Sequence, residues 1–284
     1  MLSAQTFVAR RLFRITKRCG SLRGLHPKPR RRNTRSIMLQ APSVILAVDA
    51  GNSRIKWGMH NGTWLSLGTA ANTEVSSLRD AWQNLPAPDC IVIANVAGEK
   101  IGSALQQLIH DFRARVHWVS ARDFQCGVRN SYTMPSQLGA DRWAAAIAAW
   151  HLCHEACVVV NAGTAVTVDA LSAEGVFLGG LIIPGISLMR ESLAKNTTAL
   201  KLERGEFNLF PANTADAIES GVVQALCGAI ESMRSALRAG KAPQCLLSGG
   251  NAKDLQPHLN LPAKVLDNLV LEGLVIIAGE GAAK

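Results

Sequence analysis

The feature that most constrains this sequence is one folding pattern that occurs twice, about 112 residues apart. In the first copy a buried strand at 44–48 runs into a turn at 49–53, and two strands joined by Asn61-Gly62 follow. Asn-Gly between two strand-like segments is a strong hairpin signal. In the second copy a strand at 158–160 leads into a glycine turn, and a further hairpin follows at 165–183. Two such copies predict two related halves, each built on its own sheet.

The intervals between these strands have helical spacing. Apolar periodicity predicts helices at 76–85, 99–113, 141–154, 214–238 and 267–279, and short strands at 91–94, 116–119 and 245–248. The fold class is therefore α/β with mixed sheets. We place the boundary near Cys157, which gives an N-terminal domain at 38–156 and a C-terminal domain at 157–284.

Charge divides the chain unevenly. The formal charge is +9, but residues 1–37 hold eleven of the 30 Lys and Arg and no acidic residue. Nineteen basic and 21 acidic residues remain, a charge of −2. The basic leader is open to three interpretations: an organellar targeting segment, a nucleic-acid-binding arm, or an upstream stretch of a chain whose translation starts at Met38. We expect residues 1–37 to be disordered or untranslated, with no nucleic acid as partner.

The rest of the composition excludes several classes of protein. At 48% hydrophobic and 18% charged residues the chain can bury a core, so wholesale disorder is excluded. No apolar run approaches the roughly 20 residues that span a bilayer, so we expect no membrane segment. Seven scattered cysteines form no disulfide framework, as in a reducing compartment. His151, Cys153, His154 and Cys157 resemble metal ligands, but we interpret the cysteines as buried residues at the end of an Ala-rich helix.

The two glycine turns carry the candidate chemistry. A strand that ends in Asp-x-Gly presents a carboxylate beside backbone N–H groups that can bind an anion, and the glycine lets a phosphate approach closely. Asp49 can hold Mg²⁺ directly or through water, with Asn52, Ser53 and Lys56 facing the phosphates. The second turn, 161–164, has Asn161 at the position that matches Asp49.

Four motifs narrow the comparison to one family. They are Asp-x-Gly-Asn-Ser-x-x-Lys at 49–56, Tyr-x-x-Pro-x-x-Leu-Gly-Ala-Asp-Arg at 132–142, Ala-Gly-Thr-Ala-x-Thr-x-Asp at 162–169, and Gly-Gly-x-Ile-x-Pro-Gly at 179–185. Leu246-Leu247-Ser248-Gly249-Gly250-Asn251 follows as an adenosine-binding segment would. From about Val44 to Gly281 the chain resembles the type III pantothenate kinases, also called the Bvg accessory factor family. They belong to the actin-like ATPase superfamily of acetate and sugar kinases.

This resemblance implies a duplicated actin-like (ribonuclease H-like) ATPase fold, with two domains and a nucleotide cleft between them. It implies ATP-dependent phosphorylation of pantothenate to 4'-phosphopantothenate, the first step of coenzyme A synthesis, by a cytoplasmic homodimer whose pocket the partner chain completes. It assigns ATP binding to Asp49, Ala50, Gly51, Asn52, Ser53, Arg54, Ile55, Lys56 and Thr164. It assigns Mg²⁺ to Asp49, the proton acceptor to Asp141, and pantothenate binding to Tyr132, Gly139, Ala140, Asp141, Arg142 and Thr214. Asn161 replaces an Asp linked to a bound K⁺ or NH₄⁺ in many relatives, which puts that cation in doubt.

The residues themselves allow other interpretations. Asp141 begins a helix and could be its N-cap, and the helix N-terminus would favour its ionised form. Arg142 could supply positive charge where the phosphoryl group passes, or be a solvated first-turn charge. Tyr132 is the only tyrosine. Two alternative functions remain: another phosphotransferase or a phosphatase of the same superfamily, and a non-catalytic regulatory or nucleic-acid-binding protein.

Overall fold

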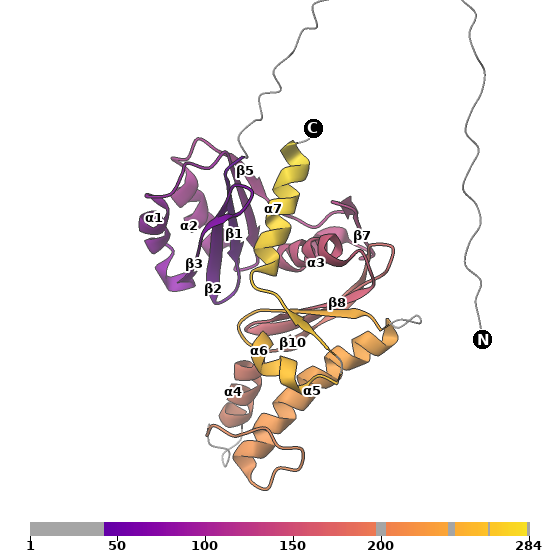
Figure 1. Ribbon diagram of the computed structural model, residues 1–284. Coiled ribbons are helices and arrows are strands. Elements are labelled where there is room, and N and C mark those ends of the chain that lie inside the picture. The colour runs from indigo at the N-terminus through magenta and orange to yellow at the C-terminus, as the bar shows by residue number, and fades with distance from the viewer. Residues whose placement is uncertain (1–42, 197–202, 238–241, 261, 283–284) are drawn as a thin grey trace, which may run out of the picture. The chain divides into compact units, whose positions relative to one another are not determined.

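A computed structural model describes residues 43–196, 203–237, 242–260 and 262–282. The basic leader lies outside the described residues. The first sheet has the strand order β3-β2-β1-β4-β5 (Figure 1). Its strands are β1 (Ile45–Ala50), β2 (Arg54–His60), β3 (Trp64–Ala71), β4 (Cys90–Asn95) and β5 (Arg115–Trp118).

The second sheet repeats this arrangement and extends it. Its order is β12-β11-β8-β9-β10-β7-β6. Its strands are β6 (Phe124–Gln125), β7 (Val128–Asn130), β8 (Cys157–Ala162), β9 (Ala165–Leu171), β10 (Val176–Pro184), β11 (Gln244–Ser248) and β12 (Lys264–Val265).

The pairing senses of the two sheets match strand by strand. In each, an antiparallel meander of three strands (β1-β2-β3 and β8-β9-β10) is followed by two strands parallel to its first strand (β4-β5 and β11-β12). This confirms the duplicated α/β fold that the repeat predicts. The strands β6 and β7, which precede the predicted boundary at Cys157, belong to the second sheet. The division of the chain into domains stays a prediction.

Seven α-helices lie in the described part of the chain. They are α1 (Ser77–Trp82), α2 (Glu99–Ile109), α3 (Ala140–Cys153), α4 (Ile186–Asn196), α5 (Thr214–Ala236), α6 (Ala252–Leu255) and α7 (Leu269–Ala282). The sequence predicted five of them within a few residues at either end and missed α4 and α6. Short 3₁₀ turns lie at Asn72–Glu74, Pro135–Gln137 and Gln256–His258.

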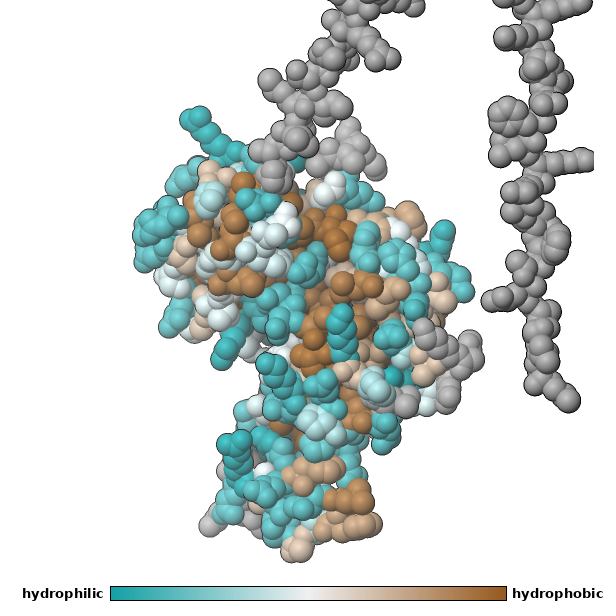
Figure 2. All heavy atoms as spheres, in the orientation of Figure 1, coloured by the Kyte–Doolittle hydropathy of each residue, from teal (hydrophilic) through white to brown (hydrophobic). Residues whose placement is uncertain are grey.

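Alternating side chains divide the protein into three apolar layers. Along β1, Leu46, Val48 and Ala50 face α1 and α2, while Ile45 and Ala47 face the other way. That second side forms a central core with α3, α7 and one face of the second sheet. The opposite face of the second sheet packs against α5 and α6. The helices α3 and α7 therefore lie between the sheets, and apolar side chains gather where they lie in the space-filling view (Figure 2).

The fully buried Trp143 of α3 anchors this central layer. Its indole Nε1 donates to Oε1 of Gln125 at 2.9 Å, which fixes α3 to β6. At the other side of the layer, Trp64 Nε1 donates to Oε1 of Glu272 at 2.7 Å and joins β3 to α7. The N-terminus of α3 is thereby held between the two sheets, where the candidate site lies.

Candidate active site

The two glycine turns meet each other. Ser53, in the turn after β1, lies 2.7 Å from Thr164, in the turn after β8, measured between their hydroxyl oxygens. Within the turns, Gly51 N–H donates to the Arg54 carbonyl and Gly163 N–H to the Ala165 carbonyl, each at 3.1 Å. The predicted pair of facing turns is thus present, and in each turn the glycine N–H donates to a carbonyl at the start of the next strand.

A third turn packs against the second. Gly249 has φ +97°, and a Cβ there would lie 2.5 Å from the Ala162 carbonyl oxygen, so the close approach requires glycine. The N–H of Asn251 donates to the same oxygen at 3.0 Å. The Gly-Gly segment after β11 therefore lies against the end of β8, next to the turn that contains Thr164.

Asn72 supports the first turn and was missed by the sequence analysis. Its Nδ2 donates to the carbonyl oxygens of Gly51 (2.9 Å) and Asn52 (2.8 Å), and its own N–H reaches the Ser53 carbonyl at 3.4 Å. Asn72 thus holds three successive residues of the turn, two through its side-chain amide and one through its backbone N–H. An Asn just after a strand gives no such signal in the sequence, because its partners lie about 20 positions away.

The residues predicted to bind ATP differ in what their side chains can reach. Asn52, Ser53, Arg54 and Thr164 are exposed at the turns. Ala50 and Ile55 are completely buried against α1 and α2, so only their backbone atoms could contact a nucleotide. Lys56 lies opposite Asp49 in the β1–β2 pair.

Asp49 and Asp141 come from different elements, and the charge of Asp141 acts on Asp49. Burial, together with the charge of Asp141, raises the pKa of Asp49 to about 7, and Lys56 opposes the shift. Burial also raises the pKa of Asp141, and the hydrogen bond from the Arg142 N–H (2.8 Å) lowers it in part. The expectation that the helix N-terminus keeps Asp141 ionised is therefore outweighed by desolvation.

Asp141 is not the N-cap of α3. Gly139 occupies that position, Ala140 is the first helical residue, and Asp141 lies in the first turn. Gly139 is confined as well, because a Cβ there would lie 2.6 Å from Oδ1 of Asp141. The Gly-Ala-Asp-Arg segment thus starts the helix and places the Asp141 carboxylate at its tip.

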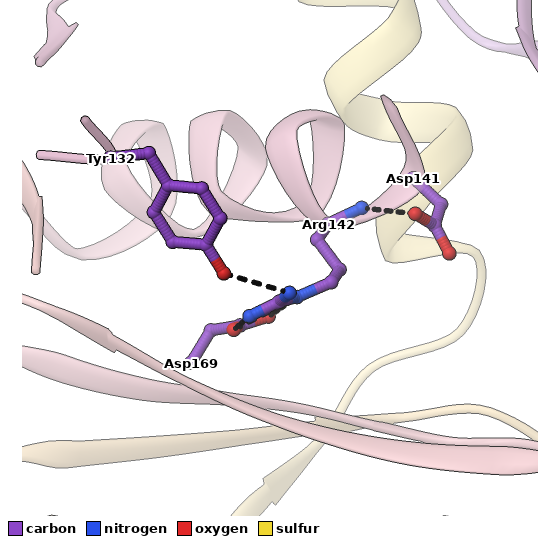
Figure 3. A network of polar contacts seen from close by, with 4 residues as sticks. All are labelled: Tyr132, Asp141, Arg142 and Asp169. Atoms are coloured by element: carbon purple, nitrogen blue, oxygen red, sulfur yellow. Dashed lines mark hydrogen bonds and ion pairs between the residues drawn. The ribbon is translucent and has the colours of Figure 1, made fainter. Parts of the chain in front are cut away.

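Arg142 is not a solvated charge, because its side chain is only 6% exposed. Its Nε donates to both carboxylate oxygens of Asp169 (3.1 and 3.2 Å) and its Nη2 to Oδ1, while Nη1 donates to the Tyr132 hydroxyl at 3.2 Å. Figure 3 shows this side chain reaching from α3 to Tyr132 and Asp169, with Asp141 on the other side of Arg142. The structure thus brings together Tyr132, Asp141 and Arg142 and adds Asp169, which no sequence argument had assigned a role.

Thr214 lies apart from this cluster within one chain. It is the first residue of α5, after the N-cap Asn213, whose Oδ1 accepts from the Asp216 N–H at 2.9 Å. The helices α5 and α3 pack on opposite faces of the second sheet. Thr214 instead lines an open groove of about 800 Å³ between α4 and α5, with Leu188, Leu193 and Ile218.

No group of three or more His, Cys, Asp or Glu side chains among the described residues is arranged to hold a metal ion. Of the two cysteines interpreted as buried, Cys157 is buried and Cys153 is half-buried, while His151 and His154 are exposed. No described helix has the length and apolar content needed to cross a bilayer.

Solved structures with a similar fold include two at low sequence identity. A candidate Baf family transcriptional activator from Campylobacter jejuni matches with a TM-score of 0.60 and 22% identity, over 84% of this chain and 100% of that one. A candidate 2-dehydro-3-deoxygalactonokinase from Sinorhizobium meliloti matches with a TM-score of 0.54 and 17% identity, over 83% and 98%. These likenesses show the fold alone, the actin-like fold with two mixed sheets.

Sequence relatives are much closer. The family model for type III pantothenate kinase matches residues 45–236. The type III pantothenate kinase of Nitrosospira multiformis is 50% identical over 240 residues, which cover 84% of this chain and 92% of that protein. That of Nitrosomonas eutropha is 45% identical over 250 residues, covering 86% and 97%. The chain therefore belongs to the type III pantothenate kinase family.

Proposed function

We propose that this chain transfers the γ-phosphoryl group of ATP to the primary hydroxyl of pantothenate and forms 4'-phosphopantothenate, the first step of coenzyme A synthesis. Membership of the type III pantothenate kinase family makes it a phosphotransferase. The observation that carries the proposal is the meeting of the two glycine turns at Ser53 and Thr164, beside two carboxylates of raised pKa. Facing turns suit a polyphosphate, and a carboxylate of raised pKa suits a hydroxyl that must lose a proton.

In this mechanism the protein positions the reactants and stabilises charge. The turns at 49–56 and at Thr164 bind the phosphates of ATP. Asp141 accepts the proton of the attacking hydroxyl, and its raised pKa makes it a better acceptor than an ordinary Asp. Pantothenate is held by Tyr132, by the Gly139–Arg142 segment and by Thr214 of one of the two chains of a dimer.

Asp49 suits the Mg²⁺ ion that accompanies ATP. Its buried carboxylate carries an unfavourable charge, because burial and Asp141 both raise its pKa, and a divalent cation would relieve this. Mg²⁺ is usually bound by one or two carboxylates together with phosphate oxygens and water. When bound, the ion would neutralise charge on the phosphates.

A monovalent cation would have weaker support. Asn161 lies at the end of β8, opposite Ser248 in the β8–β11 pair. Its amide offers a carbonyl oxygen but no negative charge. We therefore propose that turnover depends little on K⁺ or NH₄⁺.

We also propose that the enzyme is a homodimer of the bacterial cytoplasm. Leu188 and Leu193 of α4, about 40% exposed, line the groove that Thr214 also lines. Such an apolar surface favours contact with a second copy. In a dimer, Thr214 could reach the partner's pantothenate, which explains its distance from Asp141 within one chain.

The experiment is ADP release by the purified protein with Mg²⁺ and ATP, with and without pantothenate and with and without K⁺. We expect ADP release that requires pantothenate and is nearly independent of K⁺. Folded protein that binds ATP but releases no pantothenate-dependent ADP would contradict the proposal and indicate a different acceptor. Sedimentation of the same sample tests the dimer, since a monomer at the assay concentration would refute it.

A further inference from the structure

Arg142 is held on several sides. Asp169 accepts hydrogen bonds from Nε and Nη2 of Arg142. The ring centroids of Tyr132 and Phe177 lie 6.0 and 5.8 Å from the guanidinium carbon of Arg142. The two rings also pack edge to face, 5.7 Å apart. The side chains of Arg142 and Asp169 are 6% and 2% exposed. A guanidinium paired in this way with a carboxylate moves little, and the carboxylate neutralises most of its charge. Arg142 is therefore poorly suited to stabilise the charge of a phosphoryl group in transfer.

The backbone leaves room for this ion pair. A Cβ at Gly180, directly opposite Asp169 in the β9–β10 pair, would lie 2.0 Å from Oδ1 of Asp169 and 2.8 Å from Nη2 of Arg142. The hydroxyl of Thr167, on the same face of β9, also hydrogen-bonds to Asp169. Glycine at 180 is therefore what lets the carboxylate lie under α3.

The direction of the hydrogen bond between Arg142 and Tyr132 determines where the hydroxyl proton of Tyr132 can point. Arginine can only donate, so the Tyr132 oxygen accepts from Nη1 at 3.2 Å. The hydroxyl proton of Tyr132 must then point to another acceptor. Tyr132 is itself fixed by its N–H, which donates to Oδ1 of Asn130 at 3.0 Å.

We propose that Asp169 is a positioning residue of the acceptor-substrate site: it holds Arg142 so that Tyr132 presents its O–H to an oxygen of the acceptor, a carbonyl or carboxylate of pantothenate. This rests on the proposed function. Asp169 touches neither substrate nor phosphate in this role and acts through Arg142 and Tyr132. The arrangement orients a donor toward the molecule that Asp141, the neighbouring residue of Arg142, deprotonates.

A purely structural role explains the ion pair less well. A buried ion pair is often no more stabilising than apolar residues of the same size, so stability alone gives little reason for it. Its third partner is the tyrosine that the family resemblance assigns to pantothenate. An orienting role accounts for both the cost of burial and the position of the pair.

The first test is Asp169→Asn, which keeps the shape of the side chain and an acceptor for Arg142 but removes the charge. We expect the KM for pantothenate to rise by about tenfold, the size of effect that one charge-assisted hydrogen bond gives, with the KM for ATP changed less than about twofold. A variant that only loses folded protein would lower kcat and leave both KM values alone. Unchanged KM for pantothenate in Asp169→Asn overturns the proposal.

A double-variant comparison tests the route through Tyr132. Tyr132→Phe removes only the hydroxyl, and we expect it to raise the KM for pantothenate as Asp169→Asn does. If Asp169 acts through Tyr132, Tyr132→Phe with Asp169→Asn is no worse than Tyr132→Phe alone. If the two substitutions raise the KM for pantothenate independently, so that their effects multiply, the link is refuted. A Tyr132→Phe enzyme with the wild-type KM for pantothenate would also refute it, and this outcome can be measured even if Asp169→Asn fails to fold.

Gly180→Ala disturbs the same ion pair by placing a Cβ against Asp169 and Arg142. Its matched control is Gly228→Ala on α5, where a Cβ would meet open space. We expect Gly180→Ala to raise the KM for pantothenate and Gly228→Ala to leave it unchanged; a Gly180→Ala enzyme with wild-type KM contradicts the proposal. Wild-type turnover is measured first. No pantothenate-dependent turnover would refute the proposed function, whereas normal wild-type turnover with unaltered variants would refute only the role of Asp169.

Discussion

The hydroxyl oxygens of Ser53 and Thr164 lie 2.7 Å apart, although 111 positions of the chain separate them. Each belongs to the glycine turn of one of the two repeated units, so the contact joins the halves of the duplication at equivalent turns. A ligand bound by both turns must come between or alongside these hydroxyls. The contact therefore marks where the phosphates of ATP are expected.

Ser53→Ala and Thr164→Val should each weaken ATP binding. Each removes one hydroxyl at the phosphate site, and the loss of one hydrogen bond is expected to raise the KM for ATP roughly two- to tenfold. The KM for pantothenate should stay within error. Steady-state kinetics with each substrate varied in turn measures both, and a change confined to pantothenate would place the phosphates elsewhere.

Asn72→Ala should loosen the first turn without touching a substrate. The two carbonyl oxygens that Asn72 binds would lose their donor, so we expect the KM for ATP to rise by roughly two- to tenfold. Ser77→Ala is the control, because its hydroxyl donates to the Glu74 carbonyl, which lies beyond the turn. Equal effects of the two substitutions would show that Asn72 has no special relation to ATP.

Asp141→Asn should abolish most turnover while the protein stays folded. A positioned base typically contributes at least about 100-fold to the rate, so kcat should fall by that factor or more. The melting temperature should not fall, because burial already penalises the carboxylate, as its raised pKa indicates. Turnover close to that of the wild type would remove Asp141 from the mechanism.

The pKa of Asp49 makes a prediction about stability and pH. Its folded-state pKa of about 7 lies above the ordinary 3.8, so the folded protein binds the extra proton. The resulting stabilisation is complete below about pH 3.8 and is lost as the pH rises through about 7. Asp49→Asn removes this dependence, so the free energy of unfolding of the variant should exceed that of the wild type more at pH 8 than at pH 5. Urea unfolding in EDTA measures it; a gap that shrinks toward pH 8 would contradict the shift.

Removal of residues 1–37 should leave kcat and both KM values unchanged. Every residue assigned to the site lies between Asp49 and Thr214, and the family match begins at residue 45. A comparison of the Met38-start protein with the full chain in one assay checks this. A large loss of activity would show that the basic leader takes part in function.

The fold was predictable where its signals are local. The glycine turns and the Asn61-Gly62 hairpin lie within a few residues of the strands that they join, so both meanders followed from the sequence. Two-residue strands such as β6 and β12 carry too little periodicity to be recognised. Their places in the second sheet depend on partners far along the chain.

The site was predictable in its residues more than in its contacts. Tyr132, Asp141 and Arg142 do lie together, but the partner of Arg142 is 27 positions away on another element. Asp169 stood in a quoted motif, and an acidic residue between Val168 and Ala170 of a buried strand could have signalled a buried cation partner. Burial, which decides the pKa values of both Asp49 and Asp141, cannot be judged from spacing alone.

The position of α7 has a consequence for how the protein is made. This helix, Leu269–Ala282, covers the face of β1 and β4 that Ile45, Ala47 and Val92 present. The first strands of the fold thus share their apolar cover with α3 and α7, two helices that come much later in the chain. During synthesis this side of the first sheet therefore stays incompletely covered until α7 has been made, so we expect the N-terminal half not to complete its folding by itself.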